Sequence, residues 1–257
     1  MSEFAQRRVA FNGMMRPLLL GLALMGLAGT AAAGKPDDIA ESEMKLLPAY
    51  CVDTMGFSYG DAYTNTSPRA GHWVGLMGKS FWAMHHYCWA LINLNRSRRA
   101  GISAQTRRGL WESVRGDYGY VLKNATPDFI MLPEIYTRIG EVELLLGRPE
   151  KAGEAFGRAR QLKPDYWPAY SHWAEFLMKI GRRPEAMKIV ISGLENAPGA
   201  KVLLEQYRVL GGKTADLPKP VEKPQPAAEP VANDGEAAMP KALPASSPAP
   251  DASDEQK

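Results

Sequence analysis

Two consecutive stretches of sequence decide the fold of this chain. Residues 133–166 read PEIYTRIGEVELLLGRPEKAGEAFGRARQLKPDY, and residues 167–200 read WPAYSHWAEFLMKIGRRPEAMKIVISGLENAPGA. The second stretch repeats the first at a spacing of 34 residues. Pairs of positions that hold the same residue include Tyr136 and Tyr170, Gly147 and Gly181, Arg148 and Arg182, Ala152 and Ala186, and Pro164 and Pro198. Self-similarity at a fixed spacing predicts a repeat architecture.

The repeated positions are those that a pair of antiparallel helices needs. Glycine and proline stand where the chain must reverse between helices. Small residues such as Ala152 and Ala186 let the two helices approach closely, and large residues such as Phe156 and Val190 fill the remaining space. The two stretches therefore predict helix-turn-helix units and an all-α fold.

The period and these residues resemble the tetratricopeptide repeat (TPR), a helix-turn-helix unit. The match includes the large-small pairs Ile139-Gly140 and Trp173-Ala174, and the small residues Ala159 and Gly193 of the second helices. The resemblance implies a short TPR-like solenoid with two clear units, residues 133–166 and 167–200. It also implies that the first helices line a concave face, which in this family holds a peptide or a segment of another protein.

Both ends of the two clear units are predicted to be covered. Residues 201–212 have apolar residues at helical spacing before two glycines, which predicts a capping helix over the open end of the stack. Residues 79–132 predict a divergent helix pair, whose Gly116 and Tyr120 resemble the small and large residues of a degenerate TPR unit. Residues 34–78 fit no repeat, and we expect an irregular segment there.

The first 33 residues have the order of a secretory signal peptide. Three arginines precede an apolar run at residues 18–28, and three alanines end at Ala33. We expect cleavage after Ala33 and export to the periplasm or the cell exterior; an uncleaved anchor is the weaker interpretation, because a bilayer-spanning helix needs roughly twenty residues. Cleavage would remove three Arg and one Glu, so the formal net charge would fall from +3 to +1. We therefore expect neither nucleic-acid binding nor stable membrane insertion of the mature chain.

Residues 213–257 are rich in Pro, Ala, Glu, Asp and Lys and offer little for a core to bury. This composition predicts a disordered tail. Two interpretations of the tail are a passive tether and a segment that binds a partner or spans a cell wall.

The chain has two cysteines, Cys51 and Cys88. In an oxidising compartment they most simply form a disulfide, which would join the irregular segment to the first helix of the divergent pair. Unpaired buried thiols and a functional thiol or metal site are the alternatives, since His85 stands three residues before Cys88.

Sequence motifs for catalysis are absent. There is no G-x-S-x-G elbow, phosphate-binding loop, dinucleotide-binding motif or paired C-x-x-C. We therefore expect no enzyme, no metal and no cofactor. The adjacent histidines His85 and His86 are expected to be divided between core and surface, and His172 is expected to be a structural or surface residue without a role.

The TPR resemblance implies a partner-binding groove formed by polar and apolar residues of the two first helices. The predicted groove residues are Glu134, Thr137, Glu141, Leu144, Leu145, Ser171, Glu175, Met178 and Lys179. Its glutamates outnumber its lysine, unlike the basic, carboxylate-binding groove of some family members. This charge count favours a protein or peptide partner with a basic or neutral segment and an apolar anchor.

The most favoured function is therefore an exported TPR adaptor in a cell-envelope assembly. Two other classes remain open. One is a scaffold subunit of a polysaccharide-export or secretion machine, and the other is a thiol- or metal-dependent enzyme built around Cys51, His85 and Cys88.

Overall fold

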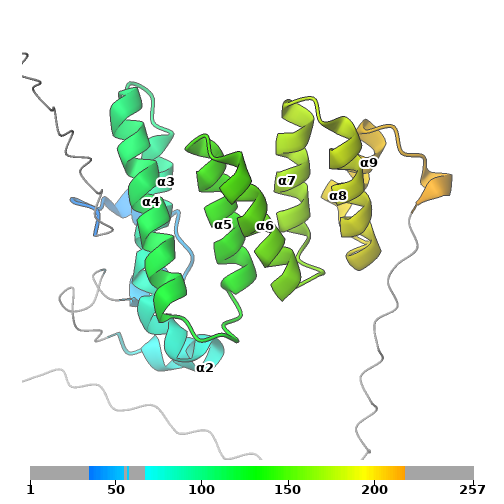
Figure 1. Ribbon diagram of the computed structural model, residues 1–257. Helices are drawn as coiled ribbons and strands as arrows, with labels where there is room; N and C mark the ends of the chain where they lie inside the picture. The colour runs from blue at the N-terminus through cyan, green and yellow to red at the C-terminus, as the bar shows by residue number, and fades with distance from the viewer. Residues whose placement is uncertain (1–34, 55–56, 58–66, 218–257) are drawn as a thin grey trace, which may run out of the picture. The chain divides into compact units, whose positions relative to one another are not determined.

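The computed structural model describes residues 35–54, 57 and 67–217, and the regular elements in these ranges are all helical. All of these residues fall in one compact unit. Figure 1 shows three helix pairs in succession, α3 with α4, α5 with α6 and α7 with α8. The predicted signal peptide and residues 218–257 of the predicted tail lie outside the described residues. Among the helices described, none is both long and apolar enough to span a bilayer.

The two predicted repeats form two helix pairs. The first consists of α5 (Leu132–Leu145) and α6 (Pro149–Leu162), and the second of α7 (Trp167–Lys179) and α8 (Arg183–Asn196). Each of these helices has a proline at its first or second position, where the missing amide costs nothing. The predicted TPR-like, all-α architecture is therefore confirmed.

The turns inside the two repeats have the same geometry. Gly147 and Gly181 have φ angles of 76° and 80°, in the left-handed region that favours glycine. The amides of Arg148 and Arg182 each donate to the carbonyl five residues earlier, both at 2.8 Å. This hydrogen bond closes the end of the first helix in each pair, so the repeated Gly-Arg dipeptide marks a repeated turn.

Within each repeat the helices meet at small residues. A Cβ at Gly140 would lie 2.7 Å from the ring of Phe156, and one at Gly193 would lie 3.0 Å from Tyr170. Fully buried alanines hold the equivalent contacts; they are Ala152, Ala159, Ala174 and Ala186. Because the helix backbones are this close, larger side chains at these positions would force the pairs apart.

The helix α9 (Lys201–Val209) follows the second repeat as the predicted cap. Its buried residues Leu203 and Tyr207 join the core formed by α7 and α8. The hydroxyl of Tyr207 also donates to the carbonyl of Asp216 (2.9 Å), in the short 3₁₀ helix η3 (Thr214–Asp216). The apolar end of the stack is thus covered, as a repeat array requires.

The divergent helix pair consists of α3 (Met84–Ser97), preceded by a 3₁₀ turn η2 (Gly78–Ala83), and α4 (Ala104–Asn124). Ser103 caps α4, because its hydroxyl accepts from the amide of Thr106 at 3.0 Å. Tyr118 and Phe81 are the largest of its fully buried side chains, and they share one core with α5. That the pair is a degenerate TPR unit remains a prediction.

The segment before this pair is mostly irregular, as expected. It contains the short helix α1 (Glu41–Met44), a 3₁₀ turn η1 (Cys51–Asp53) and the eight-residue helix α2 (Ala70–Met77). Two glycines inside α2 lower its helix propensity, which is why the sequence does not reveal it.

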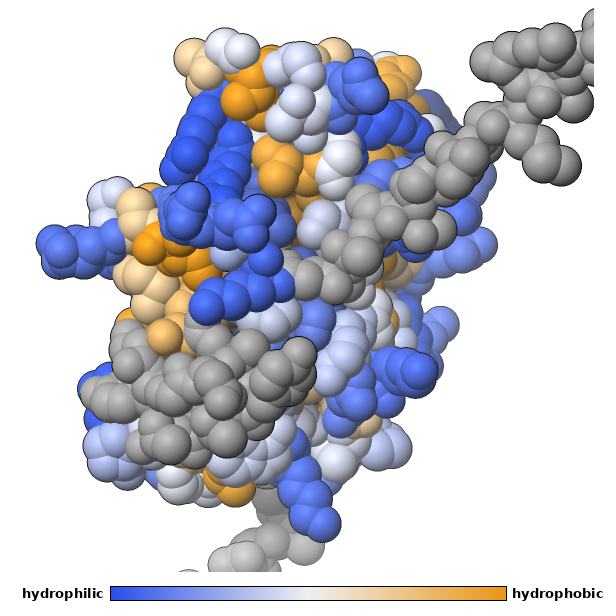
Figure 2. Space-filling model, turned by 90° about the vertical axis from the view of Figure 1, so that its left-hand side faces the viewer, coloured by the Kyte–Doolittle hydropathy of each residue, from blue (hydrophilic) through white to orange (hydrophobic). Residues whose placement is uncertain are grey.

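On the face of the molecule in Figure 2, hydrophobic side chains form separate patches among hydrophilic ones.

A disulfide joins Cys51 to Cys88, with their Cα atoms 5.7 Å apart. Both residues are fully buried. The bond fixes the irregular segment to α3, so the predicted pairing is confirmed, and the alternative of unpaired thiols is not what the structure shows.

Candidate functional site

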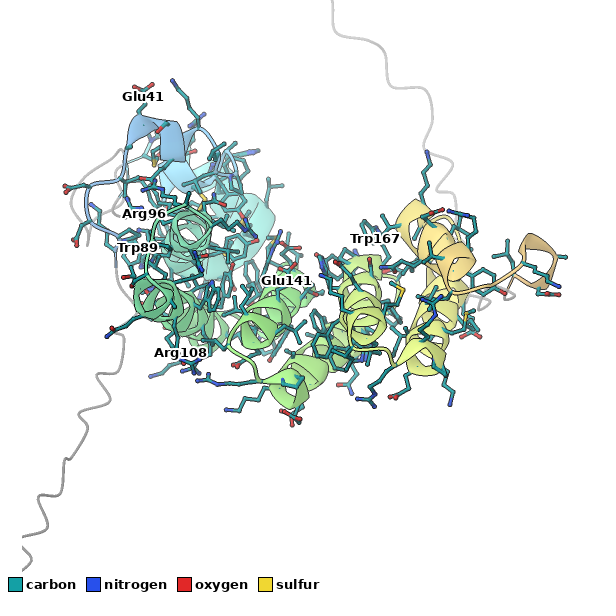
Figure 3. The ribbon with its side chains drawn as sticks, turned by 90° about the horizontal axis from the view of Figure 1, so that it is seen from above. Glu41, Trp89, Arg96, Arg108, Glu141 and Trp167 are labelled. Carbon is teal, nitrogen blue, oxygen red and sulfur yellow. A yellow bond between two sulfur atoms is a disulfide. The ribbon has the colours of Figure 1, made fainter. Side chains whose placement is uncertain are left out.

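A pocket of about 280 Å³ opens between α3, α5 and α7, which are the first helices of the three pairs. Its lining residues are Leu94 and Arg98 from the end of α3, Glu141, Leu144 and Leu145 from α5, and His172, Glu175, Phe176 and Lys179 from α7. Figure 3 shows Glu141 on the side of α5 that faces α7. A concave surface that combines apolar and charged side chains is typical of a binding site.

Helix periodicity explains why these side chains meet. His172, Glu175, Phe176 and Lys179 stand at positions i, i+3, i+4 and i+7 of α7, which share one face of a helix. The lining residues of α3 and α5 follow the same three- and four-residue spacing. Each helix therefore offers one face to the pocket and uses its other faces for packing.

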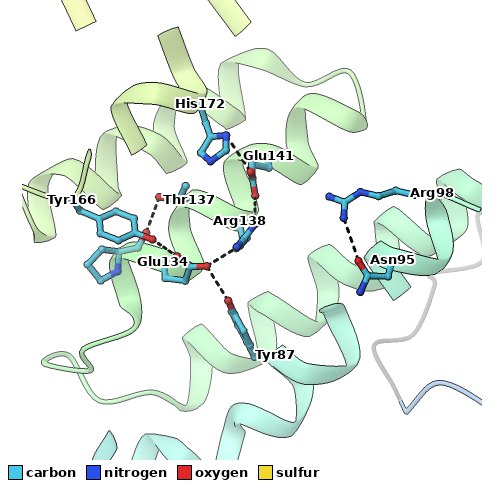
Figure 4. A network of polar contacts seen from close by, with 10 residues as sticks. Tyr87, Asn95, Arg98, Glu134, Thr137, Arg138, Glu141, Tyr166 and His172 are labelled. Atoms are coloured by element: carbon cyan, nitrogen blue, oxygen red, sulfur yellow. Dashed lines mark hydrogen bonds and ion pairs between the residues drawn. The ribbon is translucent and has the colours of Figure 1, made fainter. Parts of the chain in front are cut away.

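A partly buried carboxylate, Glu134, ties the three helices together at their N-terminal ends (Figure 4). Its Oε1 accepts hydrogen bonds from Tyr87 Oη at 3.0 Å and from Arg138 Nε at 2.8 Å, and its Oε2 accepts one from Tyr166 Oη. Tyr87 belongs to α3, and Tyr166 immediately precedes α7. One side chain of α5 thus sets the positions of both neighbouring helices.

Arg138 extends this network to the pocket. Its Nη1 donates to Glu141 Oε2 at 3.1 Å, and Glu141 Oε1 lies 3.2 Å from His172 Nδ1. Burial raises the pKa of Glu134, but hydrogen bonds from Tyr166 and Arg138 and the charge of Arg138 outweigh burial, so the pKa is lowered. Burial lowers the pKa of Arg138, but the two carboxylates outweigh burial and raise it. The guanidinium therefore stays charged between two carboxylates.

The structure places five of the nine predicted groove residues in the pocket. These are Glu141, Leu144, Leu145, Glu175 and Lys179. Glu134, Thr137, Ser171 and Met178 do not line this pocket.

Each of these four is engaged elsewhere. Glu134 holds the hydrogen-bond network described above. Thr137 is 2% exposed and its hydroxyl donates to a backbone carbonyl of its own helix at 2.8 Å. Ser171 is buried, and its carbonyl accepts from Gln206 at 3.1 Å. Met178 packs against the core of the second repeat. Helical spacing alone therefore does not show which residues of α5 and α7 line the pocket.

Four pocket residues were not predicted as site residues: Leu94, Arg98, His172 and Phe176. His172 and Phe176 share the helical spacing of Glu175 and Lys179, so the periodicity of α7 contained the signal. The residues of α3 had no comparable signal, because the 34-residue period does not extend to that helix.

The pocket does not carry the excess of free negative charge that the sequence predicted. Glu134 is enclosed by its hydrogen-bond donors, Glu141 is paired with Arg138, and Glu175 Oε1 lies 2.8 Å from Lys179 Nζ. The charge count behind the preference for a basic segment is therefore wrong, because it treated paired carboxylates as free ones. The preference for a basic or neutral segment itself remains a prediction.

Both histidines of α3 are buried, with 5% of His85 and 7% of His86 exposed. The expectation that they divide between core and surface is wrong, because Asp117 and Tyr120 of α4 pack against them. His86 Nδ1 lies 2.7 Å from Asp117 Oδ1, and His85 Nδ1 lies 2.8 Å from the carbonyl oxygen of Trp82. Burial, together with neighbouring His86, lowers the pKa of His85 to about 4.

The residues on which the enzyme alternative is built have other contacts in the structure: His85 with the carbonyl of Trp82, and Cys51 with Cys88. Within the described parts of the chain, no group of three or more His, Cys, Asp or Glu side chains is arranged to hold a metal ion. Cys88, the candidate nucleophile, is used in the disulfide. A thiol-dependent mechanism therefore lacks its thiol in this structure.

Comparison with known families identifies the repeats. The family model described as tetratricopeptide repeat matches residues 143–205. These residues belong to the tetratricopeptide repeat family. The TPR match runs from the end of α5 into α9 and does not include α3 or α4. No curated protein matches the chain. TPR units are protein-interaction modules, which agrees with a pocket lined by their first helices.

Proposed function

We propose that this protein is an exported TPR adaptor that binds a segment of another protein in the pocket between α3, α5 and α7. The observation that carries the proposal is the pocket itself, which brings Leu144, Leu145 and Phe176 together beside charged residues. Leu145 is 44% exposed although it is apolar, so it is available to a partner. The residues that pack the TPR helices against one another are not the ones that line the pocket.

The size of the pocket indicates what it accepts. A volume of about 280 Å³ lies just below the usual range for pockets that enclose a drug-sized molecule. It suits one or two side chains of a longer segment, with the rest of the segment lying along the helices. Burial of one large apolar side chain contributes about 1.5–3 kcal/mol, so the anchor alone gives weak binding and needs neighbouring contacts.

The proposed segment carries no excess of positive charge. Each carboxylate that lines the pocket already has a cationic neighbour in the structure, so a basic segment would find no free acidic partner. Of the two predicted kinds of segment, the neutral kind fits these pairs better.

Export and a place in the cell envelope are parts of the same proposal. They are supported by the signal-peptide pattern of residues 1–33 and by the disulfide, which persists in oxidising compartments. We expect the mature chain to begin at Gly34, and an intact-mass measurement on protein from the envelope fraction checks this.

The binding proposal is tested by photo-crosslinking in intact cells. The photoreactive amino acid p-benzoylphenylalanine replaces Leu145 in the pocket or, as a control, Arg108, an exposed residue of α4 outside the pocket (Figure 3). We expect a discrete set of proteins crosslinked at position 145 and not at position 108, identified by mass spectrometry. The same proteins at both positions, or none at position 145, would contradict the proposal. A fixed set of envelope proteins in constant ratio would indicate the scaffold alternative.

A further inference from the structure

The pocket is shared between the TPR region and a helix outside it. Leu94 and Arg98 line the pocket from the end of α3, whereas the family match begins at residue 143. These two residues are four apart, so α3 presents an apolar side chain and a guanidinium on one face. The TPR match therefore includes neither of them.

The end of α3 is held by residues 35–54, which we call the strap. Glu43 of the strap accepts hydrogen bonds from Arg96 Nε at 2.7 Å, Arg96 Nη2 at 2.8 Å and Arg99 Nη2 at 2.7 Å. Hydrogen bonding to Arg96 outweighs burial and lowers the pKa of Glu43 to about 2. Figure 3 shows Arg96 on the side of α3 that faces the strap. The last turn of α3 is therefore fixed by charged hydrogen bonds, which are stronger than neutral ones.

Arg98 lies between those two arginines in sequence but points to the pocket (Figure 4). Its Nη1 donates to Asn95 Oδ1 at 3.2 Å, and it forms no ion pair with a carboxylate of the described residues. Glu43 of the strap binds Arg96 and Arg99 instead. Within the described parts of the chain, Arg98 is thus the charged residue of the pocket that has no oppositely charged partner, whereas Glu141, His172, Glu175 and Lys179 are paired.

The chemistry of a guanidinium indicates its complement. It offers five N–H donors in one plane and no acceptor, and it matches a carboxylate through two parallel hydrogen bonds. An anionic group is thus the partner that Arg98 lacks. Leu145, which lines the same pocket and is 44% exposed, offers apolar surface to the same segment.

We propose that Arg98 determines the specificity of the pocket by receiving a carboxylate of the bound segment, next to the apolar side chain that anchors the segment. This inference rests on the proposed function and names its partner more closely: an acidic residue beside a large apolar one. A lysine or arginine at the same place in the segment would face Arg98 and be repelled.

The test uses the full chain with its disulfide intact and immobilised nine-residue peptides of Gly and Ser. Each peptide has a central Phe, or Ser as its control, and carries Asp, Ser or Lys at one chosen position beside the centre. Arg98→Glu is compared with wild type and with Arg108→Glu, which makes the same charge change on the exposed surface of α4 outside the pocket. Thermal melting followed by circular dichroism confirms that the variants are folded.

We expect Asp peptides to bind wild type and Arg108→Glu about three- to fivefold more tightly than Lys peptides, as for a partly exposed ion pair. Arg98→Glu should reverse this order. Equal binding of Asp and Lys peptides, or an Asp preference that survives Arg98→Glu, would overturn the role of Arg98 and leave the apolar anchor standing. Binding that does not depend on Phe would overturn the proposed function of the pocket as well.

Discussion

The TPR region and the region before it are held together by different kinds of contact. In α5 to α8 the helices approach at glycine and alanine positions that recur every 34 residues. Around α3 and α4 the strap is joined by a disulfide between residues 51 and 88 and by a carboxylate that binds arginines more than 50 positions later. A buried pair, His86 and Asp117, joins α3 to α4.

This difference bears on how each region evolves a binding surface. A TPR unit needs only its small and large packing positions, so its remaining surface is free to vary. The region around α3 adds single long-range pairs to its apolar core. The pocket joins both, with two walls from the TPR helices and one from α3.

The largest effect is expected where TPR helices are closest. Gly140→Trp should destabilise the chain by more than about 4 kcal/mol, because even a Cβ there would lie 2.7 Å from the Phe156 ring and the helices cannot separate without losing their core. Urea unfolding followed by circular dichroism measures the change in the free energy of unfolding.

Gly157→Ala is the matched control for this prediction. Gly157 lies on α6 in the same repeat, and its nearest neighbour is the flexible end of Arg160 at 3.9 Å. Alanine there should stabilise the helix by up to about 1 kcal/mol. A similar loss of stability in both variants would show that close packing does not distinguish these positions.

The disulfide should give the next largest effect, and it should be confined to the region around α3. Replacing Cys51 and Cys88 by alanine should cost about 2–4 kcal/mol, because the bond closes a long loop in the unfolded chain. Hydrogen exchange should show faster opening of the strap and α3, with the amides of α7 and α8 little changed. Equally faster hydrogen exchange in both regions would contradict the prediction that the disulfide acts only on the region around α3.

The same difference in contacts explains which features of the fold could be predicted from the sequence. The repeats could be predicted in detail, since Gly147 and Gly181 or Ala152 and Ala186 recur at a fixed spacing and act locally. The disulfide could be predicted because the chain has two cysteines. The role of Glu43 could not be predicted, because nothing in the sequence indicates which of the many glutamates contacts which arginines in the folded chain.

The candidate site was predicted only in part for a related reason. Helical spacing identifies a face but not how far the helix is rotated, so it does not reveal that Glu134 bonds to Tyr87 and Tyr166 or that Thr137 is buried. Arg98 was missed because its position depends on the strap, which no period in the sequence describes.

Acid should weaken the region around α3 through His85. The pKa of His85 is about 4 in the folded chain and about 6.5 in an unfolded one, so the unfolded state binds more protons between these values. The contribution of His85 to stability is therefore complete above pH 6.5 and is lost as the pH falls towards 4. Between pH 7 and pH 5 we expect a loss of about 2 kcal/mol.

The difference between wild type and His85→Gln isolates this contribution. Asp117, which faces the histidines from α4, has its pKa raised by burial against the opposing effect of His86, so its own pH dependence has the opposite sign. Because both proteins retain Asp117, subtracting their urea-unfolding free energies at each pH removes its effect. A difference that stays constant from pH 7 to pH 5 would contradict the prediction.

The smallest expected effect separates two glutamates of the pocket that look alike in sequence. Glu141 is 23% exposed in its side chain and is bound to Arg138 and His172, whereas Glu175 is 50% exposed and meets Lys179 on its own helix. Glu141→Gln should cost about 1 kcal/mol, since it removes the carboxylate from a partly buried network. Glu175→Gln should change stability by less than about 0.5 kcal/mol, as for exposed pairs. Urea unfolding of both variants side by side at pH 7 measures the difference between the two losses of stability. Equal effects would mean that the network from Glu134 to His172 does not brace α5 against α7, and that the wall of the pocket is held by TPR packing alone.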